Sequence, residues 1–374
     1  MPHRAMPPPP ALLLRRRTLL LGACTALAAT PHAHALAPRQ LQFPRDLGSH
    51  PELRTEWWYI TGQATSGQRV FGFQITFFRS RVDAAQPLRS RFAAHQLLFA
   101  HAAITDLQGR RLWHDQRIAR AGFGIAEASE TDTGIRLLDW QLQREAGGTL
   151  VADLPAQDFG LQLRFDETQP LLLQGHEGLS RKGPDPAQAS HYYSVPQLAV
   201  HGQLRLQGQH FALDAPQNAE PALRSRAWLD HEWSEALMHR EAVGWDWIGM
   251  NLFDGSALTA FHLRRADGSG LWDGGSFRAP GQSARVFAQG EAVFTPRRWW
   301  TSAASQARYP VEWQVDTPAG VFSVHALLDA QELDSRGTTG AIYWEGLSEL
   351  RDAQGRVVGR GYLEMTGYAG RLRL

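Results

Sequence analysis

Two acids, a histidine and a tryptophan stand side by side near the middle of the chain, as Asp230-His231-Glu232-Trp233. Adding water to an alkene without a cofactor requires a proton donor, a base that directs the water, and aromatic faces that stabilise a tertiary carbocation. These four residues include all of those group types. In a strand, Asp230 and Glu232 would share one face and His231 and Trp233 the other, so only one pair can face a given cavity.

Asp230, His231 and Glu232 are therefore the catalytic candidates. A carboxyl group in an aromatic pocket has a raised pKa, which suits a proton donor at neutral pH. We expect Asp230 to be the acid and His231 its orienter or base. The alternative is a buried ion pair at the junction of two halves, for example with Arg226 or Arg264.

A second aromatic run, Glu56-Trp57-Trp58-Tyr59, opens an expected strand and supplies candidate ligand contacts. Its acid, Glu56, either faces a ligand at the mouth of a barrel or pairs with Arg79.

Further candidate ligand contacts lie on other expected strands. Gln74 and His101 are polar side chains that either contact a ligand or lie in the core with their hydrogen bonds made to other residues. Trp245 and Trp247 share one strand face, where core packing is the alternative role. The remaining aromatic candidates are Tyr192, Tyr193 and Trp233.

Lys182 is the only lysine among 38 basic residues, the others all being arginine. Its retention is either accidental or reflects a need for a compact ammonium in place of a planar guanidinium, for instance to hold a carboxylate or a phosphate.

Several classes of site are missing from the sequence. No second histidine lies at a ligand-like spacing from His231, so we expect no metal site. The sequence has no G-x-S-x-G elbow, so we expect no Ser–His–Asp hydrolase. It has no glycine-rich nucleotide loop, and we expect no cofactor. The formal net charge of +1 argues against a nucleic-acid partner.

The elements that must position these residues are expected to be strands. Short, roughly alternating segments rich in aromatic and aliphatic residues are separated by glycine turns. They cover residues 68–78, 97–104, 135–142, 161–165 and 198–206. Helix is expected only in short pieces, such as residues 235–240.

A shift of 188 positions brings the two halves of the chain into partial register. It aligns Trp57 with Trp245 and Tyr59 with Trp247, and further along Phe73 with Phe261. We therefore expect an all-β fold of two lipocalin-like antiparallel β-barrels packed together, over residues 36–235 and 236–374. A barrel of that size encloses one small apolar ligand.

Residues 1–35 are interpreted as an export signal. A run of three arginines, Arg15 to Arg17, precedes a short apolar stretch and an Ala-His-Ala cleavage site. The run resembles a twin-arginine signal, with an ordinary Sec signal as the alternative. The only cysteine, Cys24, lies in this leader, where a lipoprotein box is a further alternative. We expect a periplasmic or secreted protein with no transmembrane segment after the leader.

Ten segments, taken in order, resemble the AttH-like branch of the carotenoid 1,2-hydratase family. They are residues 43–51 (FPRDLGSHP), 56–62 (EWWYITG), 73–79 (FQITFFR), 99–103 (FAHAA), 178–183 (GLSRKG), 189–194 (ASHYYS), 228–234 (WLDHEWS), 244–247 (GWDW) and 343–346 (YWEG), with 361–368 (GYLEMTGY) completing the series.

The resemblance implies a two-domain lipocalin-like fold and an elongated hydrophobic ligand of isoprenoid, polyketide or lipid type. Its hydratase branch adds water to a terminal alkene of acyclic carotenoids, other relatives are pericyclases, and exported members look like partners of lipid-type ABC permeases. The function is therefore expected to be cofactor-independent hydration, or else carriage of a lipid for a permease. An enzyme needs a carboxylate that faces an enclosed aromatic pocket. A carrier needs an open apolar cavity without a buried acid. A structural envelope protein needs neither, and side chains should fill its barrels.

Overall fold

The computed structural model describes residues 36–215, 219–236 and 238–372. Antiparallel strands dominate this part of the chain, as expected from the alternating sequence pattern. No α-helix occurs within it, and its three 3-10 helices are Arg45–Leu47 (η1), Asp83–Ala85 (η2) and Pro221–Leu223 (η4). The helix expected over residues 235–240 is wrong: the described positions there form bends and a turn, because this segment carries the chain from one sheet to the other.

The N-terminal half forms a 14-stranded antiparallel sheet. Its central order is β4-β3-β2-β1-β14-β12-β9-β8-β7-β6-β5, and the sheet curls until β4 contacts β6. The strands are β1 (Thr55–Ser66), β2 (Arg69–Arg81), β3 (Gln96–Asp106), β4 (Arg111–Arg120), β5 (Ala126–Ala128), β6 (Gly134–Leu137), β7 (Trp140–Arg144), β8 (Leu150–Pro155), β9 (Phe159–Asp166), β10 (Leu172–Leu173), β11 (Leu179–Arg181), β12 (Ala189–Leu206), β13 (Gln209–Ala212) and β14 (Arg226–Ser234).

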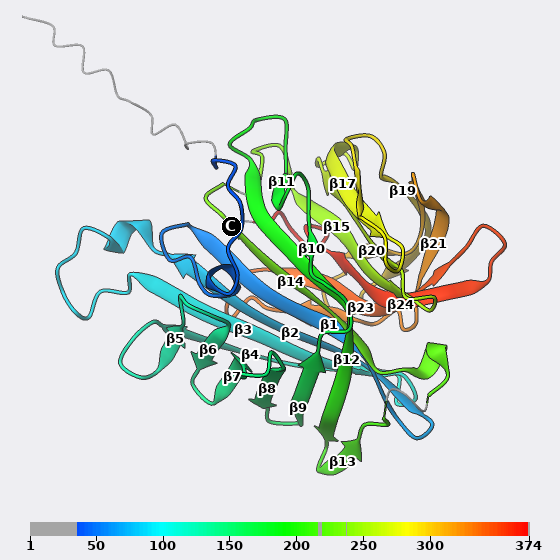
Figure 1. Cartoon of the computed structure of the whole chain (residues 1–374), viewed down its shortest axis with the longest axis horizontal. Helices are drawn as coiled ribbons and strands as arrows, with labels where there is room; N and C mark the ends of the chain where they lie inside the picture. The colour runs from blue at the N-terminus through cyan, green and yellow to red at the C-terminus, as the bar shows by residue number, and fades with distance from the viewer. Residues whose placement is uncertain (1–35, 216–218, 237, 373–374) are drawn as a thin grey trace, which may run out of the picture. The chain divides into compact units, whose positions relative to one another are not determined.

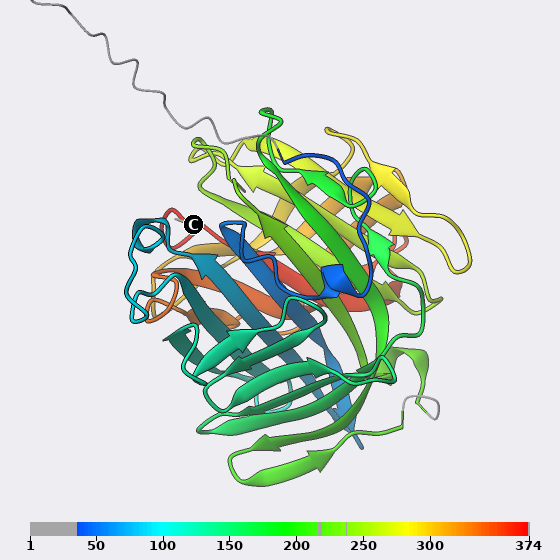
Figure 2. The same cartoon turned by 60° about the vertical axis from the view of Figure 1, so that its left-hand side comes forward.

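The C-terminal half forms a second, 10-stranded antiparallel sheet in the order β18-β17-β16-β15-β24-β23-β21-β20-β19, with β22 paired to β23. Figures 1 and 2 show it in yellow-green to red beside the blue-to-green N-terminal sheet. Its strands are β15 (Gly244–Leu252), β16 (Ala257–Arg264), β17 (Gly270–Arg278), β18 (Arg285–Phe287), β19 (Val293–Thr301), β20 (Arg308–Thr317), β21 (Gly320–Ala326), β22 (Glu332–Asp334), β23 (Ile342–Arg351) and β24 (Val357–Met365).

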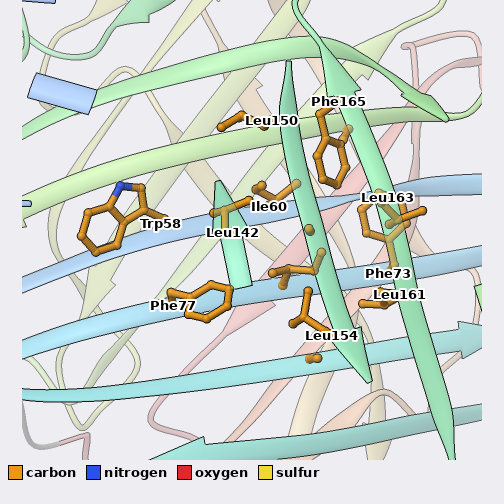
Figure 3. Packing of buried hydrophobic residues seen from close by; sticks show 14 of the residues in the cluster. Trp58, Ile60, Phe73, Phe77, Leu142, Leu150, Leu154, Leu161, Leu163 and Phe165 are labelled. Atoms are coloured by element: carbon orange, nitrogen blue, oxygen red, sulfur yellow. The ribbon is translucent and has the colours of Figure 1, made fainter. Parts of the chain in front are cut away.

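The interior of the N-terminal half is filled by its own side chains. Alternate residues of β1 and β2, such as Trp58, Ile60, Phe73 and Phe77, are almost fully buried against apolar residues of β7, β8 and β9 (Figure 3). Side chains of this size each contribute roughly 1.5–3 kcal/mol when buried. This half therefore carries a packed core where a lipocalin-type barrel was expected to enclose a ligand.

The outer faces of the two sheets pack against each other. Strand β1 contacts β24, while β12 and β14 contact β15. The approach is close: a Cβ on Gly72 would lie 2.7 Å from the Tyr362 hydroxyl and 2.9 Å from the Leu347 Cβ. Gln197 and Asn251 also connect the halves through a backbone-to-side-chain hydrogen bond of 2.8 Å. The chain leaves the first sheet after Ser234 and enters the second at Gly244.

The internal repeat holds on the first strand of each half and fails on the second. Tyr59 on β1 and Trp247 on β15 both face the junction and make an edge-to-face contact, with ring centroids 5.4 Å apart. Phe73, however, lies in the core of its half, whereas Phe261 faces the junction. The two hairpins pair in different registers, because Tyr59 is opposite Thr76 while Trp247 is opposite Phe261 itself.

The expected leader, with its arginine run and Cys24, lies outside the described residues. In the part of the chain that is described, no helix is long and apolar enough to cross a membrane.

Candidate functional site

A cavity of about 330 Å³ lies between the outer faces of the two sheets, and most of its lining is apolar. Strands β1, β2, β3, β12 and β14 form one wall, and strands β15, β16, β23 and β24 form the other. Its aromatic lining includes Trp57, Tyr59, Tyr192, Trp245, Trp247 and Tyr343. The junction of two halves is a common place for a small-molecule site.

Asp230 reaches this cavity from β14 and is only 3% exposed. Its carboxylate accepts hydrogen bonds from the Tyr192 hydroxyl at 2.7 Å, the Ser194 hydroxyl at 2.5 Å and the Trp228 indole at 2.6 Å. Burial raises the pKa of Asp230 to about 7 and outweighs these donors, with the negative charge of Glu232 adding to the rise. Asp230 is thus a carboxyl group that can both hold and release a proton at neutral pH.

Glu232 lies two residues further along β14, on the same face, and pairs with the ammonium of Lys182 at 3.0 Å. The hydroxyl of Ser190 also donates to it. Lys182 lies over the rings of Tyr192 and Phe261, with its Nζ 4.7 Å and 4.2 Å from their centroids. The only lysine of the chain is therefore a nearly buried cation in the wall of the cavity.

The ion-pair alternative for this motif applies to Glu232, but with Lys182 as its partner. Neither arginine suggested by the sequence takes part: Arg264 pairs with Asp246 at 2.6 Å, and Arg226 donates to the carbonyl oxygen of Ser225. Within the described residues Asp230 has no cationic partner.

The opposite wall carries two acids that the sequence analysis did not select, Glu345 on β23 and Glu364 on β24. They are directly opposite one another in the antiparallel register. Burial raises the pKa of Glu364 to about 7, and the charges of Asp230 and Glu232 add to this rise. Burial, followed by the charge of Glu364, also holds the pKa of Glu345 well above its usual range.

His101, on β3, lines the cavity and connects the two halves. Its Nδ1 lies 2.9 Å from the Tyr343 hydroxyl, and its Nε2 lies 2.7 Å from the Thr338 hydroxyl. Burial lowers the pKa of His101 to about 3, so the ring is neutral at neutral pH. Gln74 lies two residues from Thr76 and donates to its hydroxyl at 2.5 Å. Gln74 does not line the cavity, so its predicted ligand contact is corrected to a buried position outside the cavity.

His231 and Trp233 turn to the opposite face of β14, away from the cavity. The His231 Nε2–H donates to Glu56 at 2.9 Å, and its Nδ1 lies 3.1 Å from the Tyr193 hydroxyl. Burial lowers the pKa of His231 to about 4. The expectation that His231 orients Asp230 or acts as its base is therefore wrong, because strand alternation places it behind the wall.

Trp58 and Tyr193 share that side of the sheet with Trp233, as members of the core of the N-terminal half. Their predicted ligand contacts are corrected to packing roles, since none of the three lines the cavity.

Glu56 contributes to the cavity wall, but its carboxylate belongs to a buried charge network on the inner face of the sheet. It accepts from Arg79 at 2.8 Å and lies 2.7 Å from His50, whose other ring nitrogen is 3.0 Å from Asp46. Burial opposes this arrangement, yet the hydrogen bonds of His231 and His50 hold the pKa of Glu56 below its usual range. Its pairing with Arg79 matches the structural alternative left open by the sequence.

Within the described residues, His50, Glu56 and His231 offer metal-ligating atoms that all lie within 4.8 Å of one another. Hydrogen bonds already engage these atoms: Glu56 Oε1 contacts both rings, and the other nitrogen of His50 contacts Asp46. Burial acts to lower the pKa of His50, but the hydrogen bonds to Asp46 and Glu56 raise it overall. A raised pKa favours the protonated ring, which cannot bind a metal. The cluster is accounted for as an ion-pair network.

The sequence profile of the AttH-like family matches residues 34–368. The chain belongs to the AttH-like family. A comparison with curated proteins gives no match.

The crystal structure of an AttH protein from Nitrosomonas europaea is 42% identical, covers 89% of this chain and 99% of its own, and superposes with a TM-score of 0.81. Kievitone hydratase from Nectria haematococca is 15% identical, with 88% and 94% covered and a TM-score of 0.67. CghA is 13% identical with the same two coverages and a TM-score of 0.53. The last two share the lipocalin-like fold with this AttH-like chain.

Glu345 and Glu364 each stood in a segment that matched the family, and each follows an aromatic residue at a spacing of two, Tyr343 and Tyr362. In a strand that spacing places the acid and the ring on one face. This pattern is the feature of the sequence that could have identified the two acids as candidate cavity residues. What the sequence could not show is that β23 and β24 are neighbours and that their outer face meets the face bearing Asp230.

Lys182→Arg is expected to weaken binding of an apolar ligand roughly tenfold while leaving the thermal midpoint nearly unchanged. The positive charge opposite Glu232 is kept, but a planar guanidinium is bulkier than the ammonium held between Tyr192 and Phe261. Titration with the neutral fluorescent probe N-phenylnaphthylamine and a melting curve test this. Arg181→Lys, the reverse exchange at the neighbouring position, is the matched control. Wild-type affinity in Lys182→Arg would show that the retained lysine is accidental.

Proposed function

We propose that this AttH-like protein binds an elongated apolar ligand of isoprenoid or lipid type between its two halves and hydrates an alkene of that ligand without a cofactor. One observation carries the proposal: Asp230, a carboxyl group with a pKa near 7, faces an aromatic cavity. A carrier would need no buried acid there. The neighbour named as a hydratase of kievitone supports hydration as a chemistry of this fold.

In the first step the π electrons of the alkene take the proton of Asp230, which becomes a carboxylate and leaves a carbocation on the more substituted carbon. The aromatic faces of Tyr59, Trp245 and Trp247 stabilise that charge. Water then forms a C–O bond to the cation. Its surplus proton passes to a carboxylate, for which Glu232 is placed on the same strand face, roughly 7 Å along from Asp230.

Return of this proton through water to Asp230 restores the starting state, so the net change is the addition of one water molecule. Asp230 thus serves as general acid and Glu232 as general base. The pair replaces the Asp230–His231 combination expected from the sequence, because His231 lies on the other face.

The proposal is tested by incubating the purified protein with acyclic isoprenoid alkenes in oxygen-18 water. A tertiary alcohol carrying the heavy isotope is the expected product. Native mass spectrometry of the exported protein identifies the co-purifying ligand. A protein that co-purifies with a lipid and never turns over any alkene would overturn hydration and leave carriage, with an ABC permease as the partner to seek.

We further propose that the protein is exported to the periplasm by the twin-arginine route. The basis is Arg16-Arg17 ahead of a short apolar stretch. Replacing both by lysine should leave precursor in the cytoplasm, as cell fractionation would show. Replacing Arg15 alone is the matched control. Normal export of the double variant excludes this route without excluding an export signal.

A further inference from the structure

The C-terminal wall of the cavity contains a carboxyl pair that neither the fold nor the proposed acid and base explains. Glu345 and Glu364 are antiparallel partners in register, and residues in that relation have Cβ atoms about 5 Å apart. Two carboxylates at that separation repel, so the pair retains a proton where isolated acids would have lost theirs. Both acids line the cavity.

The fold does not neutralise this pair. Among the described residues, no arginine, lysine or histidine forms an ion pair with Glu345 or Glu364, although each other acid of the cavity wall is engaged. The Tyr59 hydroxyl is the donor nearest to Glu345 and acts to lower the pKa of Glu345, although burial outweighs it. Its geometry falls short of a regular hydrogen bond, so within the described residues the buried Tyr59 hydroxyl and Glu345 Oε1 both lack a well-formed partner.

A buried donor in one cavity wall and a buried acceptor in the other each cost stability while they lack a hydrogen-bond partner. Tyr59 is 6% exposed and Glu345 is 2% exposed, and both face the cavity. Buried polar groups without a protein partner form hydrogen bonds to a ligand or to water that occupies the cavity.

The charge balance indicates what kind of ligand. Asp230, Glu232, Glu345 and Glu364 line the cavity, whereas Lys182 is matched by Glu232 and Arg79 by Glu56 on the other face. Aromatic rings surround the acids, including Tyr59, Trp245 and Trp247. Carboxylates combined with aromatic faces favour a positive centre embedded in apolar surface.

We propose that the Glu345–Glu364 pair is a cation-recognition site that receives a positive centre on an otherwise apolar ligand. That centre is either an ammonium group carried by the ligand or the carbocation formed during hydration. The second case rests on the proposed function, whereas the first does not. Binding of an ammonium ligand exchanges one positive charge for another: the cation enters, the shared proton leaves for solvent, and no bond to the ligand forms or breaks. The carbocation instead arises in the cavity when the alkene takes the proton of Asp230, and the pair then only stabilises its charge.

Isothermal titration calorimetry tests this with two probes of equal chain length, octyltrimethylammonium chloride and a neutral tertiary alcohol. Near pH 7, the ammonium should bind roughly tenfold more tightly than the alcohol. Repeating the titration in buffers of different ionisation enthalpy should show release of up to about one proton per ammonium bound and none for the alcohol.

Glu345→Gln and Glu364→Gln should each remove the proton release and the preference for the ammonium while leaving alcohol affinity unchanged. Both variants should fold, since each removes a buried repulsion. The pKa of Glu364 is raised to about 7 in the fold, so its stabilising contribution is lost as pH rises through that value. The variants should therefore melt above wild type at about pH 8, which the same samples can show.

Equal affinity for the two probes, no binding of either, or proton release that survives in both variants would overturn the inference. If the wild-type protein hydrates an alkene but shows no preference for the ammonium probe, the inference is overturned while the proposed function stands. Ammonium preference without turnover of any alkene supports an amine ligand and counts against hydration. Loss of turnover in Glu364→Gln, together with loss of the preference, assigns the site to the carbocation.

Discussion

Asp230→Asn is expected to lower the rate of alkene hydration by roughly 10²–10⁴-fold, the usual contribution of a general acid. The amide has the shape of the carboxyl group but carries no transferable proton. Its oxygen can still accept from Ser194 and Trp228, and its NH₂ can donate to the Tyr192 hydroxyl, so the local hydrogen bonds are kept. Binding of N-phenylnaphthylamine and the melting temperature should remain close to wild type.

The pH profile provides a second readout for the same acid. The proposed mechanism uses the protonated form of Asp230, whose pKa is raised to about 7. The hydration rate should therefore fall as pH rises above that value. Ser194→Ala removes a donor that stabilises the carboxylate, which raises the pKa of Asp230 further. The alkaline limb of the pH profile should then move to higher pH in Ser194→Ala, a variant in which Asp230 itself is unchanged.

A loss of several kcal/mol of stability in Asp230→Asn, with an unshifted profile in Ser194→Ala, would identify Asp230 as a structural group. Unchanged turnover in Asp230→Asn would exclude it as the acid.

Glu56→Gln should have the largest effect on stability, lowering the free energy of unfolding by about 3–5 kcal/mol. The substitution leaves Arg79 without its anion and His50 with Asp46 alone, at positions where burial prevents water from compensating. Chemical denaturation at neutral pH measures the loss. Glu52→Gln, the same exchange at an exposed position four residues earlier, should stay within about 0.5 kcal/mol of wild type.

The network also sets a pH window for stability. The pKa of Glu56 is lowered in the fold, so its contribution is present above the ordinary glutamate pKa and is lost as pH falls below it. The pKa of His50 is raised, so its contribution is complete below the ordinary histidine pKa and is lost as pH rises through the raised one. In Glu56→Gln the acid-side loss should be smaller than in wild type, and an identical acid limb would contradict the assignment.

Strand alternation made the fold class and part of the site predictable. Asp230 and Glu232 share one face and His231 and Trp233 the other, which is the division seen in β14. The period of two cannot say which face meets a cavity, and so His231 was assigned to the wrong side. Trp57, Tyr59, Trp245 and Trp247 were predicted as ligand contacts and do line the cavity, whereas Trp58 and Tyr193 pack in the core.

The remaining parts of the site depend on long-range pairing. Glu345 and Glu364 become neighbours only through the register of β23 with β24, and they meet Asp230 only through the packing of two sheets. Likewise, Phe261 was aligned with Phe73 by the internal repeat, yet a change of hairpin register turned it to the opposite side. Neither register nor sheet packing leaves a local mark in the sequence.

Because the cavity is built from the outer surfaces of two separately packed cores, each wall can change without disturbing the interior behind it. The wall bearing Asp230 and the wall bearing Glu345 and Glu364 come from separate stretches of the chain that meet after Ser234. The protein is therefore suited to combinatorial divergence: a relative could retain its acid while exchanging the opposing surface for one that accepts another molecule. Chimaeras joined between β14 and β15 would transfer ligand preference with the C-terminal segment and proton-donating capacity with the N-terminal one.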